Sequence, residues 1–180
     1  MTAPVVLVRS AGRDDADRIT SVFLASRAAA LPYLPDLHTL AETLEFFQNV
    51  VLPQQQVWVA RSEDGDVVGF AALHHDWLDH LYVRPDLRGA GVGSVLLEAA
   101  RDAAGEHLQL YCFQRNQQAR AFYESRGFAI VASSDGSGNE EREPDLTYRW
   151  ERAPGPYLAA SSSASCTNVL TAAPVPPLGV

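Results

Sequence analysis

The chain has 180 residues, 47% of them hydrophobic and 20% charged, which predicts one globular domain with a sizeable core. Its formal net charge of -8 argues against general nucleic-acid binding, and no apolar run approaches the roughly 18 residues that span a membrane. All 14 Lys and Arg positions hold arginine, which excludes a phosphate-binding loop built on lysine.

The N-terminus and the cysteines bear on the cellular compartment. The opening "MTAPVVLVRS" lacks the basic start and the apolar stretch of a signal peptide, so a cytoplasmic location is expected. Cys112 and Cys166 show neither C-x-x-C nor metal-site spacing, and we expect reduced thiols.

The first half of the chain predicts both strands and helices. A β-rich run opens it, and two segments with apolar residues at helical spacing follow. Two β-branched runs joined at Asp64-Gly65 then predict a hairpin, and Pro85 ends a further strand. The expected order is a strand over 5–11, helices over 12–32 and 37–50, a hairpin over 54–75 and a strand over 77–85.

The second half repeats this mixture with clear helix boundaries. Gly105 ends one helix, while Asn116 caps a second helix that Gly127 stops. Residues 1–152 are therefore predicted to form one domain. The uncharged, Pro/Ala/Ser-rich segment 153–180 is predicted to be a flexible tail, with packing on the domain or on a second subunit as the alternative. The expected elements are helices over 91–107 and 116–127, strands over 107–113, 128–134 and 146–151, and a polar loop over 135–145.

The stretch "RGAGVG", Arg88 to Gly93, concentrates bare backbone at one place. A dinucleotide-binding loop would need G-x-G-x-x-G directly after a strand, but here the spacing is G-x-G-x-G and five residues intervene. The pattern R-x-x-G-x-G before a helix suits a diphosphate, because glycine lets backbone N–H groups approach and the helix dipole adds positive charge. A tight turn that serves packing alone is the structural alternative.

Two longer motifs extend this observation. "LDHLYVRPDLRGAGVGSVLLEAAR" resembles the acetyl-CoA motif of the GNAT superfamily of N-acetyltransferases, and "NQQARAFYESRGFAIV" resembles that family's N-x-x-A-x-x-[FL]-Y-x-x-x-G-F. The resemblance covers about residues 5–151, and the loop "DGSGNEEREPD" is similar to one common bacterial branch. It implies an α/β (α+β) fold with a mixed, mostly antiparallel, splayed β-sheet flanked by helices, and an acyltransferase that uses acetyl-CoA and no metal.

The resemblance also implies where acetyl-CoA binds. The strand before the loop splays from its neighbour at a bulge, and its free backbone groups hold the pantetheine arm. Tyr123 matches the general acid that protonates the departing thiolate, and its structural alternative is an aromatic core residue. The implied cofactor-binding residues are Leu81, Tyr82, Val83, Arg88, Gly89, Ala90, Gly91, Val92, Gly93, Ser94, Asn116, Ala119 and Tyr123.

The general base is less defined. Some relatives place a glutamate on the strand after the loop helix, but the matching position here is Tyr111. Strand alternation predicts that Asp79 or His80 faces the cleft, and His80 has the better intrinsic pKa for a base. A water chain and the neighbouring His74, His75 and Asp76 are alternatives, and the stretch "HHDWLDH" is not expected to bind a metal.

The acceptor end is predicted from charge. The loop 135–145 concentrates carboxylates, and Glu140 and Glu141 are the candidates for binding a cationic amine. A small-molecule amine is preferred over a protein amine, with neither nucleic acid nor membrane as a partner. The alternative is a sensor module that binds acyl-CoA with little catalysis, and the resemblance is compatible with a homodimer.

Overall fold

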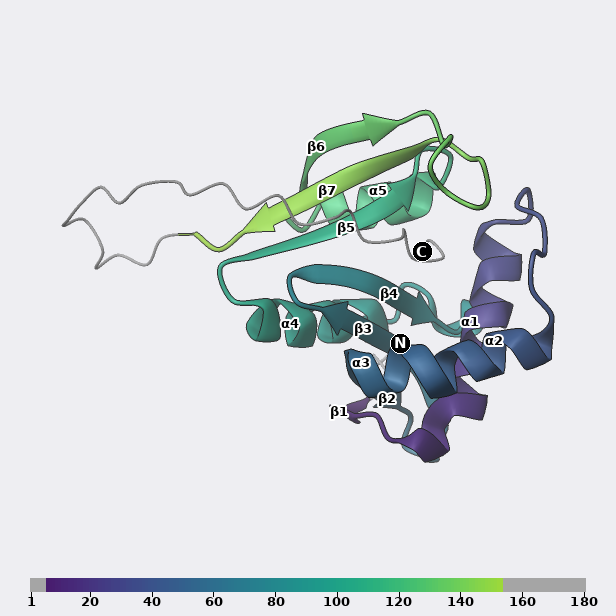
Figure 1. Ribbon diagram of the computed structural model, residues 1–180. Coiled ribbons are helices and arrows are strands. Elements are labelled where there is room, and N and C mark those ends of the chain that lie inside the picture. The colour runs from purple at the N-terminus through teal and green to yellow at the C-terminus, as the bar shows by residue number, and fades with distance from the viewer. Residues whose placement is uncertain (1–5, 154–180) are drawn as a thin grey trace.

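The computed structural model describes residues 6–153, so the predicted tail from residue 154 onward and Cys166 lie outside the described part. A seven-stranded sheet runs in the order β1-β2-β3-β4-β5-β7-β6, and helices flank it (Figure 1). Every neighbouring pair is antiparallel except β4–β5, which is parallel. The predicted mixed, mostly antiparallel sheet is confirmed. No helix within residues 6–153 is both long and apolar enough to cross a bilayer.

The elements follow the predicted order, with one helical segment longer than predicted. Helix α2, the π-helical turn η2 and α3 follow one another from residue 40 to residue 54, so the helical region predicted to end at residue 50 continues past Pro53. The strands are β1 Leu7–Ser10, β2 Gln56–Arg61, β3 Val67–His74, β4 Trp77–Val83, β5 His107–Phe113, β6 Ala129–Ser134 and β7 Asp145–Glu151. The helices are α1 Ala16–Ala30, α2 Leu40–Phe46, α3 Leu52–Gln54, α4 Val92–Ala104 and α5 Gln117–Glu124, with short turns η1 Arg13–Asp15, η2 Phe47–Val51 and η3 Pro85–Leu87.

Helix α5 begins at the predicted residue for a local reason. The Asn116 side-chain oxygen accepts a hydrogen bond from the Ala119 N–H at 3.1 Å, which satisfies a donor that has no partner within the helix. After the last turn, Gly127 adopts a φ of +83°, a left-handed conformation that glycine reaches without steric cost. These two residues therefore fix where Tyr123, on the same helix, lies.

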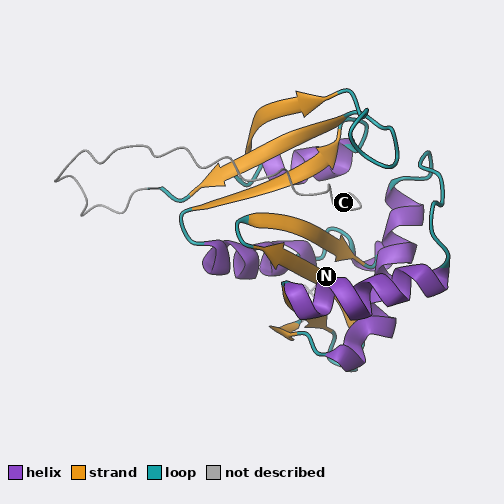
Figure 2. Ribbon diagram, viewed as in Figure 1, coloured by secondary structure: helices purple, strands orange, loops and turns teal. Residues whose placement is uncertain are grey.

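Helices cover the sheet on both faces (Figure 2). On one face α1 and the segment α2–η2 pack on Phe70 and Tyr82, with Phe23 and Phe47 among the buried residues. On the other face α4 packs on β3 and β4, and Leu96 is fully buried there. The two cores hold the sheet rigid up to the edge of β4, where the site lies.

Strands β4 and β5 diverge, as Figure 1 shows. They pair at a single position, Trp77 opposite Gln109. In the β3–β4 ladder, Leu78 and His80 are opposite consecutive residues of β3, so Asp79 is an extra residue in β4, a β-bulge. The predicted splay and its bulge are both present. Beyond the bulge, β4 and β5 of the described chain share no further register position.

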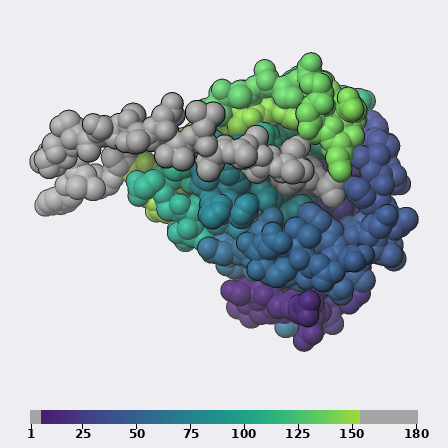
Figure 3. Space-filling view, viewed as in Figure 1, coloured from purple at the N-terminus to yellow at the C-terminus, as the bar shows by residue number. Residues whose placement is uncertain are grey.

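The loop between β6 and β7 spans the open end of this splay. It reaches the α1–α2 region in two places: Arg27 Nη2 lies 3.1 Å from Glu141 Oε1, and His38 Nε2 lies 3.2 Å from Glu140 Oε2. In the space-filling view the green atoms of this loop abut the blue atoms of the α1–α2 region (Figure 3). The two halves of the sheet are thus joined at both ends of the divergence.

Candidate active site

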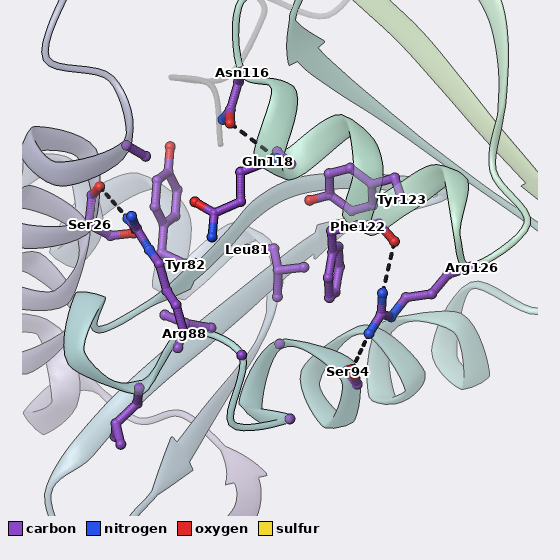
Figure 4. Close-up of a pocket in the computed structure, with 17 residues that line it drawn as sticks. Ser26, Leu81, Tyr82, Arg88, Ser94, Asn116, Gln118, Phe122, Tyr123 and Arg126 are labelled. Carbon is purple, nitrogen blue, oxygen red and sulfur yellow. Dashed lines mark hydrogen bonds between the residues drawn. The ribbon is translucent and has the colours of Figure 1, made fainter.

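A pocket of about 230 Å³ opens where β4 leaves β5 (Figure 4). Its wall comes from the end of α1, the second half of β4, the glycine loop, the first turn of α4, and α5. The lining residues are Ser26, Ala30, Leu81, Tyr82, Val83, Leu87, Arg88, Gly89, Gly91, Gly93, Ser94, Asn116, Gln118, Ala119, Phe122, Tyr123 and Arg126. Most of the predicted cofactor residues are therefore brought together. Ala90 and Val92 are not among the lining residues, and the Val92 side chain is buried in the core.

The glycine loop supplies backbone to one side of the pocket. Gly89 and Gly91 have φ values of +77° and +90°, conformations that favour glycine, and a Cβ at either would meet nothing within 4 Å. Gly91 directly precedes α4, whose first N–H groups have no partner within the helix. A Cβ on Gly93 would lie 3.4 Å from the Phe122 ring, so this glycine lets α4 approach α5. The loop leaves room for an anion at the positive end of the helix.

Arg88 lies differently from the expectation. Its Nη2 donates to the backbone oxygen of Ser26 at 2.8 Å and to Ser26 Oγ at 3.1 Å, which ties the loop to α1. Sequence reasoning missed a second arginine in the pocket, Arg126. It comes from the turn after α5, and no spacing rule linked that turn to the glycine loop.

Tyr123 is both a core residue and a residue of the pocket wall. Its ring packs edge-on against Phe122 and Phe128, and the residue is 0% exposed. Its hydroxyl lines the pocket, yet it has no hydrogen-bond partner within residues 6–153 (Figure 4). Burial raises the pKa of Tyr123 well above its ordinary value, so the hydroxyl keeps its proton. A buried hydroxyl without a partner is costly, which indicates a partner supplied by a ligand.

Asp79 lies at the bulge, two residues before the pocket-lining Leu81. Gln55 Nε2 donates to Asp79 Oδ2 at 2.8 Å. Burial raises the pKa of Asp79 to about 7, and the Gln55 hydrogen bond opposes that rise. Burial mainly, and also the nearby charge of Asp79, raise the pKa of Tyr111 of β5. The Tyr111 ring stacks on that of Trp77, with ring centroids 4.6 Å apart. A carboxylate beside two aromatic rings suits an alkylammonium group.

His80, in contrast, lies in the core and not at the pocket. It is 0% exposed, among the rings of Phe23, Phe46, Phe47 and Phe70. Burial lowers the pKa of His80 to about 3, so the ring is neutral. This corrects the expectation that His80 faces the cleft. Of the alternatives, His74 ends β3, and His75 and Asp76 form the β3–β4 turn, where Asp76 Oδ2 is 2.8 Å from His107 Nε2.

The two predicted acceptor glutamates differ from each other. The Glu141 side chain is only 3% exposed and is paired with Arg27, itself 9% exposed. The Glu140 side chain is 59% exposed beside His38. Glu141 therefore joins the loop to α1, and Glu140 is the glutamate that a ligand can approach.

Replacing Glu141 by Gln is expected to lower the free energy of unfolding by about 3 kcal/mol, because Arg27 would remain buried without its counter-charge. Replacing the neighbouring Glu140 by Gln should change it by less than about 1 kcal/mol, as for exposed ion pairs. Urea denaturation of the two variants measures this difference. Equal losses of unfolding free energy in the two variants would show that the buried Arg27–Glu141 pair does not stabilise the contact between the loop and α1.

The sequence also matches a known protein family. The model of the acetyltransferase (GNAT) family matches residues 24–128, more than half of the chain. The chain belongs to the GNAT family. This GNAT protein is an acyltransferase that uses acetyl-CoA, and the sequence prediction of its family is confirmed.

Individual relatives agree with the family assignment. The GNAT chain is 31% identical over 131 residues to the peptidyl-lysine N-acetyltransferase YjaB of Escherichia coli, covering 73% of this chain and 87% of that protein. The solution structure of apo YjaB aligns with a TM-score of 0.68 at 29% identity, over 81% of this chain and 97% of that one. The PaiA N-acetyltransferase of Thermoplasma acidophilum in complex with coenzyme A shares the fold, with a TM-score of 0.66 at 16% identity over 82% and 99% of the two chains.

The residues of this GNAT protein fit acetyl-CoA. Backbone around Gly89 and Gly91 is open to a diphosphate, and β4 diverges from β5 after the pair Trp77–Gln109, beside the pocket. The Tyr123 hydroxyl offers a donor at a buried position, with no partner within residues 6–153.

Proposed function

We propose that this enzyme transfers the acetyl group of acetyl-CoA to a primary amine of a small cationic molecule, by direct attack of the amine. The observation that carries the proposal is the buried Tyr123 hydroxyl, which lacks a protein partner in the described part of the chain and lines the same pocket as the glycine loop. When bound, acetyl-CoA supplies an activated acetyl thioester. The remaining chemistry belongs to the protein's own residues.

Tyr123 acts as the general acid. As the C–N bond forms and the C–S bond breaks, the sulfur takes up a proton from the tyrosine hydroxyl. The raised pKa of Tyr123 keeps that proton available throughout the neutral range.

Asp79 acts as the general base in this proposal. An amine must lose a proton to attack, and a carboxyl group whose pKa is about 7 can both accept and release one near neutral pH. Asp79 is two strand residues from the pocket-lining Leu81, roughly 7 Å along β4. An amine bound between these two residues would be close to the Asp79 carboxyl and to a ligand in the pocket. The nitrogen of an ammonium acceptor loses two protons: one to Asp79 before attack, and a second to water as the amide forms. Tyr123 gives one proton to the sulfur and regains one from water, and Asp79 releases its proton to water, so the net product besides the amide and the thiol is one proton.

The acceptor has two candidates, both alkylammonium compounds. A small cationic amine is supported by the Trp77–Tyr111 pair beside Asp79 and by exposed Glu140. The lysine side chain of a protein is supported by the name of the relative YjaB, a peptidyl-lysine N-acetyltransferase.

Mass spectrometry of the purified protein with acetyl-CoA tests the proposal on two substrate pools. One pool holds polyamines, amino acids and aminoglycosides, and the other holds lysine-containing peptides and proteins. The chain contains no lysine, so its own lysine acetylation cannot contribute to the signal. Acetylated product in either pool supports the proposal and names the class. No product in either, with acetyl-CoA still binding, would contradict it.

The loop 135–145 gives a finer test on the productive amine. Replacing Glu140 by Gln is expected to raise KM several-fold for a dicationic amine and to leave KM for a monoamine nearly unchanged, because only the second charge faces the loop. Steady-state kinetics with matched monoamine and diamine substrates measures the ratio. An equal KM change for both would remove Glu140 from acceptor binding.

A further inference from the structure

Two arginines line the pocket, and neither has a carboxylate partner within residues 6–153. Most arginines elsewhere on this chain of net charge -8 have such a partner, as Arg27 has Glu141 and Arg101 has Glu98. The others that are unpaired in the described chain do not line the pocket; they are Arg13, Arg18, Arg61 and Arg142. An acidic protein that leaves guanidinium groups unpaired beside the N-terminus of a helix provides for an anion from outside. The two pocket arginines, Arg88 and Arg126, differ in how their side chains are held.

Arg126 is held at the first turn of α4. Its Nη2 donates to Ser94 Oγ at 2.7 Å, and its Nη1 donates to the backbone oxygen of Phe122 at 2.9 Å and to Ser125 Oγ at 3.0 Å. Its guanidinium lies 3.8 Å from the centre of the Phe122 ring. Figure 4 shows Arg126 between Ser94 and Phe122, whereas Arg88 reaches toward Ser26. Within residues 6–153 all partners of Arg126 are neutral, so its charge is available to an anion.

We propose that Arg126 is a phosphate-binding residue of the pocket, and that it supplies the positive charge for coenzyme A that the motif position alone would give to Arg88. This inference rests on acetyl-CoA as the acetyl donor. Arg88 then acts as a positioning residue that joins the loop to α1 through Ser26. Stacking on Phe122 and the Ser94 contact fix the guanidinium before the ligand arrives, which lowers the entropy lost on binding.

The segment that carries Arg126 also carries Tyr123. The residue proposed to act at the sulfur and the residue proposed to act at the phosphates are three positions apart in the sequence. Because Phe122 packs against both Tyr123 and Arg126, one helix end orients both groups. In this proposal the same short segment contacts both the sulfur end and the phosphate end of the cofactor.

Isothermal titration calorimetry with coenzyme A tests the proposal without any turnover. Arg126→Gln is expected to weaken coenzyme A binding on the order of tenfold or more, since a charge-assisted contact is lost. Arg126→Lys keeps the charge but not the planar stack on Phe122, so its affinity for coenzyme A should lie between those of the unaltered protein and Arg126→Gln. Arg149→Gln on β7 removes the same charge outside the pocket and should leave the affinity unchanged. Arg88→Gln should lose less affinity than Arg126→Gln.

Two shorter ligands locate the contact. Equal weakening for coenzyme A and 3′-dephospho-coenzyme A would assign Arg126 to the diphosphate, and weakening for coenzyme A alone would assign it to the 3′-phosphate. Either supports the proposal, provided that the thermal shift given by millimolar pantetheine, which has no phosphate, is unchanged. Unchanged coenzyme A affinity in Arg126→Gln, an equal loss with pantetheine, or a larger loss in Arg88→Gln would overturn it. If the unaltered protein failed to bind coenzyme A, the proposed function would fail as well.

Discussion

Replacing Tyr123 by Phe is expected to lower kcat by about 100-fold or more while weakening the affinity for coenzyme A by less than about tenfold, because the hydroxyl acts mainly as a proton donor and contributes at most one neutral hydrogen bond to the bound ligand. The same change should leave the free energy of unfolding unaltered or raise it. The hydroxyl is fully buried without a partner in residues 6–153, so its removal abolishes a desolvation cost and no hydrogen bond. Stopped-time acetylation assays, calorimetry and urea denaturation measure the three quantities.

Tyr148 provides the matched control. Its ring lies 6.3 Å from that of Tyr123 in the same core, but its hydroxyl donates to Glu124 Oε1 at 2.6 Å and does not line the pocket. Tyr148→Phe should therefore lower stability by about 1 kcal/mol and keep kcat. If Tyr123→Phe kept full turnover, the tyrosine would be a core residue only, and its role as the general acid would be wrong.

Replacing Asp79 by Asn is expected to remove the acidic limb of the pH profile and to lower kcat/KM by roughly 100-fold or more. In the unaltered enzyme, kcat/KM should rise with pH through about 7, as the Asp79 carboxyl loses its proton. The neighbouring His80→Phe is the control, because His80 lies among phenylalanine rings away from the pocket and should keep the limb. A limb that persisted in Asp79→Asn and vanished in His80→Phe would reverse the assignment.

The same shift predicts how stability depends on pH. The pKa of Asp79 rises from 3.8 to about 7 on folding, so the folded state binds more protons between these values. Its contribution to stability is present below about pH 4 and is lost as the pH rises through about 7. Asp79→Asn should therefore be more stable than the parent at pH 8, and the difference should shrink toward pH 4. Thermal denaturation at the two pH values measures it.

Local signals predicted most of the fold. The Asn116 cap, Gly127 after the helix and the Asp64-Gly65 turn are determined by residues adjacent in sequence, and all three are observed. The family motif likewise located the glycine loop and Tyr123. The continuation of α2 past residue 50 was missed because Pro53 looks like a stop, although proline is compatible with the first turn of a helix.

The bulge and the cross-chain contacts could not be predicted in the same way. Strict alternation fails in β4 because Asp79 is an extra residue, so Leu78 and Leu81 pack in one core while His80 turns to the opposite one. The extra residue is visible only against the partner strand β3. Arg27 with Glu141, 114 residues apart, and Arg126 with Ser94, 32 residues apart, depend on how the two halves meet, which no local pattern encodes.

The divergence of β4 from β5 also bears on how the molecule comes apart. A sheet normally gains cooperativity from continuous ladders, but here β4 and β5 share one register pair, so side-chain packing in a common core makes most of the connection between the two parts of the sheet. The part formed by β5, β7, β6 and α5 is therefore expected to open at a lower free energy than the whole domain. A ligand whose extended arm lies between β4 and β5 would contact both parts of the sheet and is expected to join them into a single unfolding transition.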